Sequence, residues 1–129
     1  MLEGLLHRNN ARGEDAVFKF DLTDVTYKGI DQSFALSLRY VPDRDVLPLE
    51  GFRLWHQNIQ SITEWAQAED VISEILKGFY DEVLPRWMDI SLSFKDTNGL
   101  LQTLRMSKSQ PKFSLSDPLE KMIYSQQCT

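Results

Sequence analysis

Residues 87–108, WMDISLSFKDTNGLLQTLRMSK, decide the fold of this 129-residue chain. Apolar and polar residues alternate on both sides of the turn sequence DTNG at residues 96–99. Alternation with a period of two is typical of strands that bury one face, and a turn rich in Asn and Gly joins such strands tightly. The stretch therefore predicts an antiparallel β-hairpin.

A second hairpin is predicted upstream of the first. Residues 16–26 alternate around Phe18, Phe20 and Leu22, and residues 33–41 place apolar side chains on one face. Gly29 and Asp31 supply the turn between them, and the Pro-Asp pair at 42–43 ends the second strand.

Between the two hairpins the apolar period becomes helical. Phe52, Trp55 and Ile59 follow Pro48 at spacings of three and four, which predicts a first helix. The order strand, strand, helix, helix, strand, strand then predicts an α+β fold. Its four-stranded antiparallel sheet would carry both helices on one face.

A second helix is predicted from a capping box, formed by Ser61 and Glu64, as far as Pro85. Its apolar positions recur at helical spacing: Ile62, Trp65, Ile72, Leu76, Phe79 and Val83. Its other face carries charged residues and is expected to be solvated.

The remaining segments lie at the two ends. Residues 8–15, RNNARGED, contain no apolar residue except Ala11, so residues 1–15 are expected to form a solvated arm. Residues 16–108 form the single predicted domain. Residues 109–129 form a polar tail, in which Asp117 is expected to cap a short helix that includes Leu119 and Ile123.

Composition and charge exclude several classes of function. The chain has 19 acidic and 14 basic residues and a net charge of −5, so we expect no nucleic-acid or membrane partner. Cys128 is the single cysteine, and no secretion signal or spanning stretch is evident, which favours a cytoplasmic location. The spacing of His7 and His56 predicts no metal site, and P-loop, Rossmann and α/β-hydrolase motifs are absent from the sequence.

The element order resembles the tunnelling fold (T-fold) of pterin- and purine-handling proteins. Three local motifs, in the same order, are similar to those of the nitrile reductases of the queuosine pathway, the QueF-like family of 7-cyano-7-deazaguanine reductases. They are YVPD at residues 40–43, EGFRLW at 50–55 and LPRW at 84–87. The resemblance covers residues 20–95.

The chain departs from these reductases at the reacting positions. The family's nucleophilic cysteine falls at Val25 and its acid–base aspartate at Gln32. Valine cannot form a thioimidate, and glutamine does not exchange a proton near neutral pH. Nitrile reductase activity is therefore not expected, and no catalytic residue is assigned. No cofactor is evident, and NADPH is implied only by the family resemblance.

The resemblance also directs attention to two glutamates. The family's purine-anchoring glutamate falls at Pro48, with Glu50 the nearest carboxylate, while its His-Glu pair falls on residues 66–67 or, after a two-residue insertion, on Ala68 and Glu69. A carboxylate accepts two parallel hydrogen bonds from the edge of a guanine-like or pterin-like ring. Glu69 and Glu50 are therefore candidate ligand-binding residues, and the alternative is that both are ordinary acids of a helix surface.

His56, beside Trp55, is a third candidate for the site, and a partly exposed helical histidine is the alternative. The resemblance further implies a homo-oligomer whose sheets join into a barrel. Leu36, Leu92 and Leu104 are candidates for lining that barrel, with their strand neighbours as the alternative.

Together these features predict a QueF-like T-fold protein that lacks nitrile reduction and binds a purine- or pterin-like heterocycle at a subunit interface. The alternative is a non-catalytic assembly or interaction protein built on the same scaffold.

Overall fold

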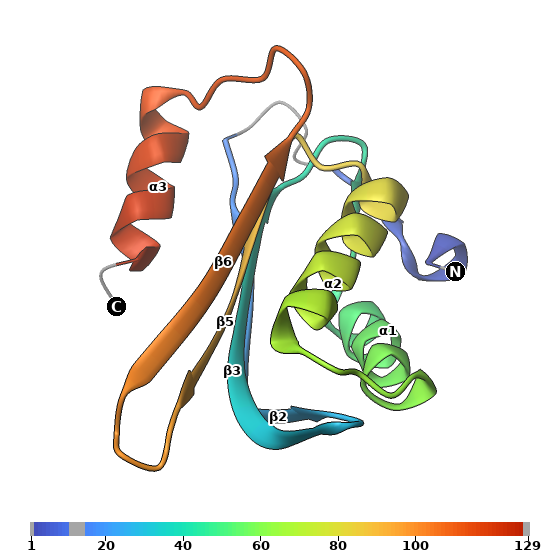
Figure 1. Cartoon of the computed structure of the whole chain (residues 1–129). Coiled ribbons are helices and arrows are strands. Elements are labelled where there is room, and N and C mark those ends of the chain that lie inside the picture. The colour runs from blue at the N-terminus through green and yellow to red at the C-terminus, as the bar shows by residue number, and fades with distance from the viewer. Residues whose placement is uncertain (1, 11–14, 128–129) are drawn as a thin grey trace.

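The computed structural model describes residues 2–10 and 15–127. Its main sheet has four antiparallel strands in the order β2-β3-β5-β6. These strands are β2 (Phe18–Tyr27), β3 (Ile30–Val41), β5 (Trp87–Lys95) and β6 (Leu101–Ser109). Helices α1 (Leu49–Ile62) and α2 (Ala68–Val83) lie together on one face of this sheet (Figure 1). The predicted α+β class, both hairpins and the element order are confirmed.

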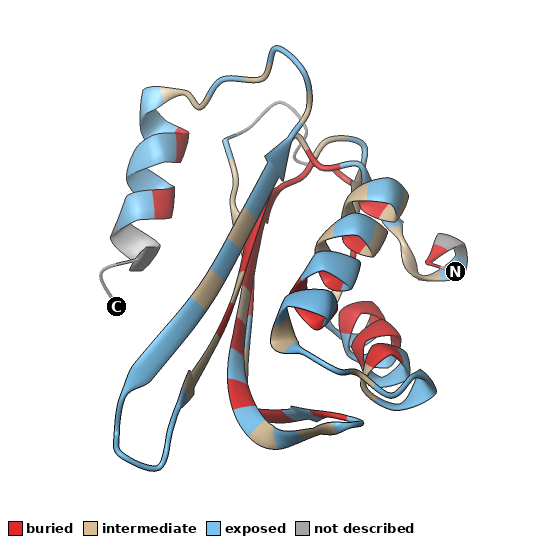
Figure 2. Cartoon of the chain, in the orientation of Figure 1, coloured by how far each residue is buried: buried red, intermediate tan, exposed pale blue. Residues whose placement is uncertain are grey.

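The core lies between the sheet and the helix pair, as the distribution of buried residues in Figure 2 shows. Alternate side chains of β3 and β5 point toward the helices because successive residues of a strand face opposite sides. These are Leu36, Leu38, Tyr40, Met88, Ile90 and Leu92, all almost fully buried. The helices meet them with Phe52, Ile72, Ile75 and Phe79, at helical spacing.

The strand leucines that were expected to line a barrel lie in this core instead. Leu36 pairs with Leu92, and Leu92 pairs with Leu104, so the three form one row across β3, β5 and β6. Leu36 and Leu92 are buried, and Leu104 packs against the same cluster. The assignment was wrong because alternation identifies a buried face without revealing that the helices cover it.

A third helix, α3 (Asp117–Gln127), covers part of the opposite face of the sheet (Figure 1). Leu119 and Ile123 are its buried side chains. The predicted short helix is thus confirmed, but its cap is different: the Ser116 hydroxyl accepts a hydrogen bond from the Leu119 amide at 3.3 Å, and Asp117 is already the first helical residue. None of the helices in the described part of the chain combines the length and apolar character needed to span a membrane.

The expectation of a solvated N-terminal arm is wrong for Leu2 and Asn9, which are buried, whereas His7 and Arg8 are exposed. Leu2 is fully buried in the core, and the short helix η1 (Glu3–Leu5) follows it. Strand β1 (His7–Arg8) then pairs with β4 (Asp45–Val46) in a small antiparallel sheet. Arm residues 11–14 lie outside the described residues, as does Cys128. One buried leucine and two paired strand residues are too short a signal to stand out in sequence.

The second helix begins six residues later than the capping box predicts, since its N-cap is Gln67 instead of Ser61. Ser61 belongs to the last turn of α1, where its hydroxyl donates to the Gln57 carbonyl at 3.0 Å. Trp65 lies in the connection to α2 and is fixed there by two hydrogen bonds. Its amide donates to the Lys28 carbonyl at 2.7 Å, and its indole N–H donates to the Ile59 carbonyl at 2.8 Å. The first bond ties the connection to the β2–β3 turn and the second ties it to α1, and together they replace the predicted first helical turns.

Gly29 makes this close approach feasible, and its substitution has a predictable cost. Its φ is +94°, and a Cβ atom at this position would lie 2.5 Å from the Trp65 carbonyl oxygen. We expect Gly29→Ala to lower the free energy of unfolding by about 2 kcal/mol, from backbone strain and the clash together. Gly99 has a φ of +84° but no neighbour within 4 Å, so Gly99→Ala is the matched control for strain alone. Equal losses in urea unfolding would show that the Trp65 contact is unimportant.

Candidate functional site

The two candidate glutamates lie on separate helices. Glu69 stands in the first turn of α2 and Glu50 in the first turn of α1. Both side chains are exposed, and Glu50 forms a long ion pair, 4.0 Å, with Arg53. The structure therefore presents each carboxylate to solvent without bringing the two into one cavity.

His56 is in the core and is not the partly exposed residue that the sequence favours as its alternative. It is 2% exposed, its Nε2 lies 2.7 Å from the Tyr27 hydroxyl, and its ring stacks on Phe52. Burial lowers the pKa of His56 to about 4, so the ring is neutral at pH 7. Burial also raises the pKa of the Tyr27 hydroxyl. A direct contact between His56 and a ligand would require α1 to separate from the sheet.

The positions of the family's reacting groups are both in the β2–β3 hairpin. Val25 lies at an irregularity in the pairing of β2, next to Asp24, whose φ is +54°. Its side chain is buried and packs in the core, while Gln32 of β3 is half-buried. The bulge thus directs the apolar side chain of Val25 into the protein interior. This is the position at which the resemblance to nitrile reductases would place a thiol.

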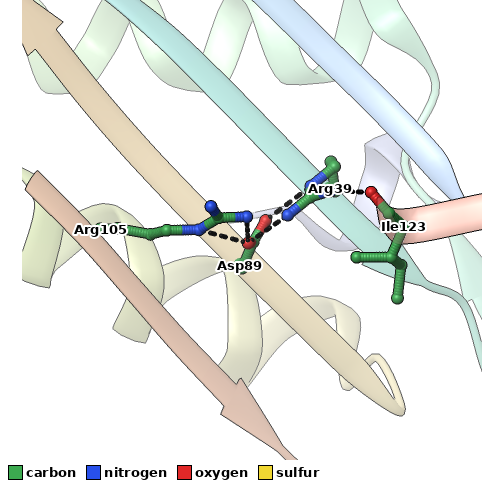
Figure 3. Close-up of polar contacts among 4 residues, drawn as sticks. All are labelled: Arg39, Asp89, Arg105 and Ile123. Atoms are coloured by element: carbon green, nitrogen blue, oxygen red, sulfur yellow. Dashed lines mark hydrogen bonds and ion pairs between the residues drawn. The ribbon is translucent and has the colours of Figure 1, made fainter. Parts of the chain in front are cut away.

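A buried ionic cluster lies on the sheet face under α3, and the sequence interpretation missed it (Figure 3). Arg39 and Asp89 are cross-strand partners, only 3% and 5% exposed. Arg39 Nε donates to Asp89 Oδ1 at 2.9 Å, and its Nη2 donates to Oδ2 at 2.5 Å. Arg105, on β6, donates to Oδ2 of the same carboxylate from Nε at 2.9 Å.

The same cluster holds the C-terminal helix. Arg39 Nη1 donates to the carbonyl oxygen of Ile123 in α3 at 2.6 Å, and the guanidinium lies 5.6 Å from the centre of the Trp87 ring. The Asp89 carboxylate is satisfied by two arginines, which makes it a structural group. The alternation of apolar and polar residues in β3 and β5 puts Arg39 and Asp89 on the polar face of the sheet. This was the signal in the sequence that pointed to the pair.

No three His, Cys, Asp or Glu side chains are grouped for metal binding anywhere in residues 2–10 and 15–127. The two candidate glutamates are exposed carboxylates in the first turns of α1 and α2.

The fold of this chain is similar to that of a solved structure. The crystal structure of an archaeosine synthase QueF-like protein, in its apo form, superposes with a TM-score of 0.61. The match covers 75% of this chain and 97% of that chain, at 16% sequence identity. The fold is QueF-like. The resemblance predicted from the three short motifs is thus confirmed at the level of the fold.

The QueF-like fold is visible in the structure and not in whole-sequence similarity. No protein-family model matches the sequence, and no curated protein matches it. One fold supports unrelated activities, so the function of this chain depends on the residues that it carries on the QueF-like fold.

Proposed function

We propose that this protein uses its QueF-like fold to bind a flat, purine- or pterin-like heterocycle, with Glu69 as the anchor, and that it does not reduce nitriles. The observation that carries the proposal is the place of Glu69, exposed on the first turn of α2. An ionised glutamate there offers two acceptor oxygens to a ring N–H and an adjacent amine. Glu50 is the substitute anchor, since its ion pair with Arg53 is long and exposed.

The loss of nitrile reduction follows from the groups at the reacting positions. Val25 carries no thiol and its side chain is buried in the core, so no covalent thioimidate can form there. NADPH would have no such adduct to reduce, and we assign it no role. Gln32 adds no acid or base.

The binding site that we propose lies between copies of the chain. Strands β2 and β6 are the two edges of the sheet, and each presents backbone groups that a second sheet can pair with. Glu69 is exposed in the single chain, so a second subunit has to supply the opposite wall of a heterocycle site. Homo-oligomerisation through the sheet edges is therefore part of the proposal.

Native mass spectrometry with a panel of deazaguanines, guanine and pterins tests this function. We expect a closed oligomer that retains one heterocycle per subunit. Glu69→Gln should weaken binding roughly tenfold to a hundredfold, because hydrogen bonds to a charged group contribute about 1.5–3 kcal/mol. Asp70→Asn is the matched control, since it removes the same charge from the same helical turn. Equal effects of the two variants would contradict the role of Glu69.

A non-catalytic assembly protein is the second candidate function. It is favoured by the core position of Val25 and by the ionic cluster of Arg39, Asp89 and Arg105, in which Arg39 also donates to the Ile123 carbonyl of α3. A closed oligomer that binds none of the deazaguanines, guanine or pterins would support this alternative. A monomer under all conditions would contradict both candidates.

A further inference from the structure

A hollow between α1 and α2 takes no part in the proposed heterocycle site. It has a volume of about 540 Å³, within the usual range of small-molecule sites. Three segments line it: Trp55, Asn58, Ile59 and Ile62 of α1, Thr63 and Trp65 of the connection, and Glu74, Gly78 and Glu82 of α2. We call it the interhelical groove.

Gly78 opens the floor of the interhelical groove. A Cβ atom at this position would come within 3.0 Å of Trp55 Cζ2, so the edge of the Trp55 ring lies directly against the bare backbone of α2. Any larger residue at position 78 would fill this part of the groove. Ile62 is strongly exposed at its rim, which adds an apolar surface to the two indole rings.

The far wall of the groove is preformed. Trp65 is held by its hydrogen bonds to Ile59 and Lys28, and Gly29 packs against its backbone. Binding of a ligand would therefore not carry the entropic cost of ordering this wall, and such preorganisation raises affinity.

The two charged residues that line the groove are both acidic. Glu74, Gly78 and Glu82 are spaced four residues apart, so both carboxylates lie on the stripe of α2 that faces the groove. None of the lining residues is basic. Helix α2 contains five acids and one lysine, and the last turn of α1, at the other wall, has no basic residue to offset the partial negative charge of a helix C-terminus.

We propose that the interhelical groove binds a small organic cation, an ammonium or guanidinium group carried on an apolar or aromatic body. The apolar body packs against Trp55, Trp65 and Ile62, and the cation lies near Glu74 and Glu82. This site does not depend on Glu69, on the sheet edges or on the heterocycle.

Three probes of similar shape and different charge test the proposal on the full chain: 2-phenylethylammonium, 2-phenylethanol and phenylacetate. The readout is the indole N–H resonances in NMR titrations. We expect the cation to shift the signals of Trp55 and Trp65, the alcohol to bind at least tenfold more weakly, and phenylacetate not to bind. Trp87 lies beside Arg39 on the other face of the sheet and is the internal reference. Similar affinity for all three probes, preference for the anion or shifts at Trp87 alone would overturn the proposal.

Charge-removing variants locate the site. Glu74→Gln and Glu82→Gln should each weaken cation binding about threefold to tenfold, whereas Asp81→Asn, which removes a charge from the same helix outside the groove, should change it less than twofold. Equal effects of the three variants would show that the cation responds only to the total negative charge of α2 and not to Glu74 and Glu82 in particular. Shifts of Trp55 and Trp65 that follow protein concentration without any probe would show that a second copy of the chain covers the groove, and would also overturn the proposal.

Discussion

Replacing Asp89 with asparagine is expected to lower the free energy of unfolding by about 3–5 kcal/mol, because the buried Arg39 guanidinium would lose the carboxylate charge that accepts two of its hydrogen bonds. Asparagine keeps the size of the side chain and removes its charge. Urea unfolding followed by circular dichroism measures the loss. Arg105→Gln should cost less, because the Arg105 side chain is 45% exposed and water can replace part of the interaction.

The control for Asp89→Asn is an exposed pair on the same sheet. Lys19 and Asp21 of β2 form an ion pair of 3.4 Å, and the Asp21 side chain is largely exposed. Asp21→Asn should change the free energy of unfolding by less than about 1 kcal/mol. The double variant Arg39→Met/Asp89→Asn should be more stable than Asp89→Asn alone, since no buried cation is then left unpaired. If both aspartate variants cost the same, the cluster does not carry the stability assigned to it.

Acid should destabilise the protein through His56. The pKa of this ring is lowered from 6.5 to about 4 in the folded state, so between these pH values the unfolded chain binds a proton that the folded chain does not. The free energy of unfolding is therefore insensitive to His56 above pH 6.5, and it falls as the pH drops from 6.5 to 4. The full difference is about 3 kcal/mol, from 1.36 kcal/mol per pKa unit.

A double variant isolates this pH dependence. In Tyr27→Phe/His56→Phe the ionisable ring is gone, the stacking position beside Phe52 is kept, and no hydroxyl is left without its partner. Urea midpoints measured at intervals from pH 7 to pH 4 should fall less steeply for the double variant than for the natural chain. Parallel curves would show that His56 is not the group responsible.

The four strands of the main sheet and the first helix were predictable because each has a local signal. Alternation in residues 87–108 depends only on neighbours in sequence, and it gave both strands and the turn. The start of α2 was not predictable, because hydrogen bonds from Trp65 to Lys28 and Ile59 decide the course of the connection. Such long-range bonds override a capping box.

The candidate site was less accessible to sequence reasoning than the fold. Glu69 and Glu50 could be placed on helix surfaces, but the burial of His56 depends on Tyr27 from another element. The Arg39–Asp89 pair depends on the register between β3 and β5, which the hydrophobic pattern does not specify. The interhelical groove depends on the missing side chain of Gly78, whose importance is evident only once Trp55 lies beside it.

The strand order has a consequence for how the chain folds. The β2–β3 and β5–β6 pairings are local hairpins, whereas the β3–β5 pairing joins Val41 to Trp87 across the entire helical segment. Closing that loop costs chain entropy before any central contact is gained, and it becomes less costly once helices have shortened the intervening segment. The central seam of the sheet is therefore expected to form after the hairpins, with α1 and α2 acting first as a compact spacer and only then as a cover for the core.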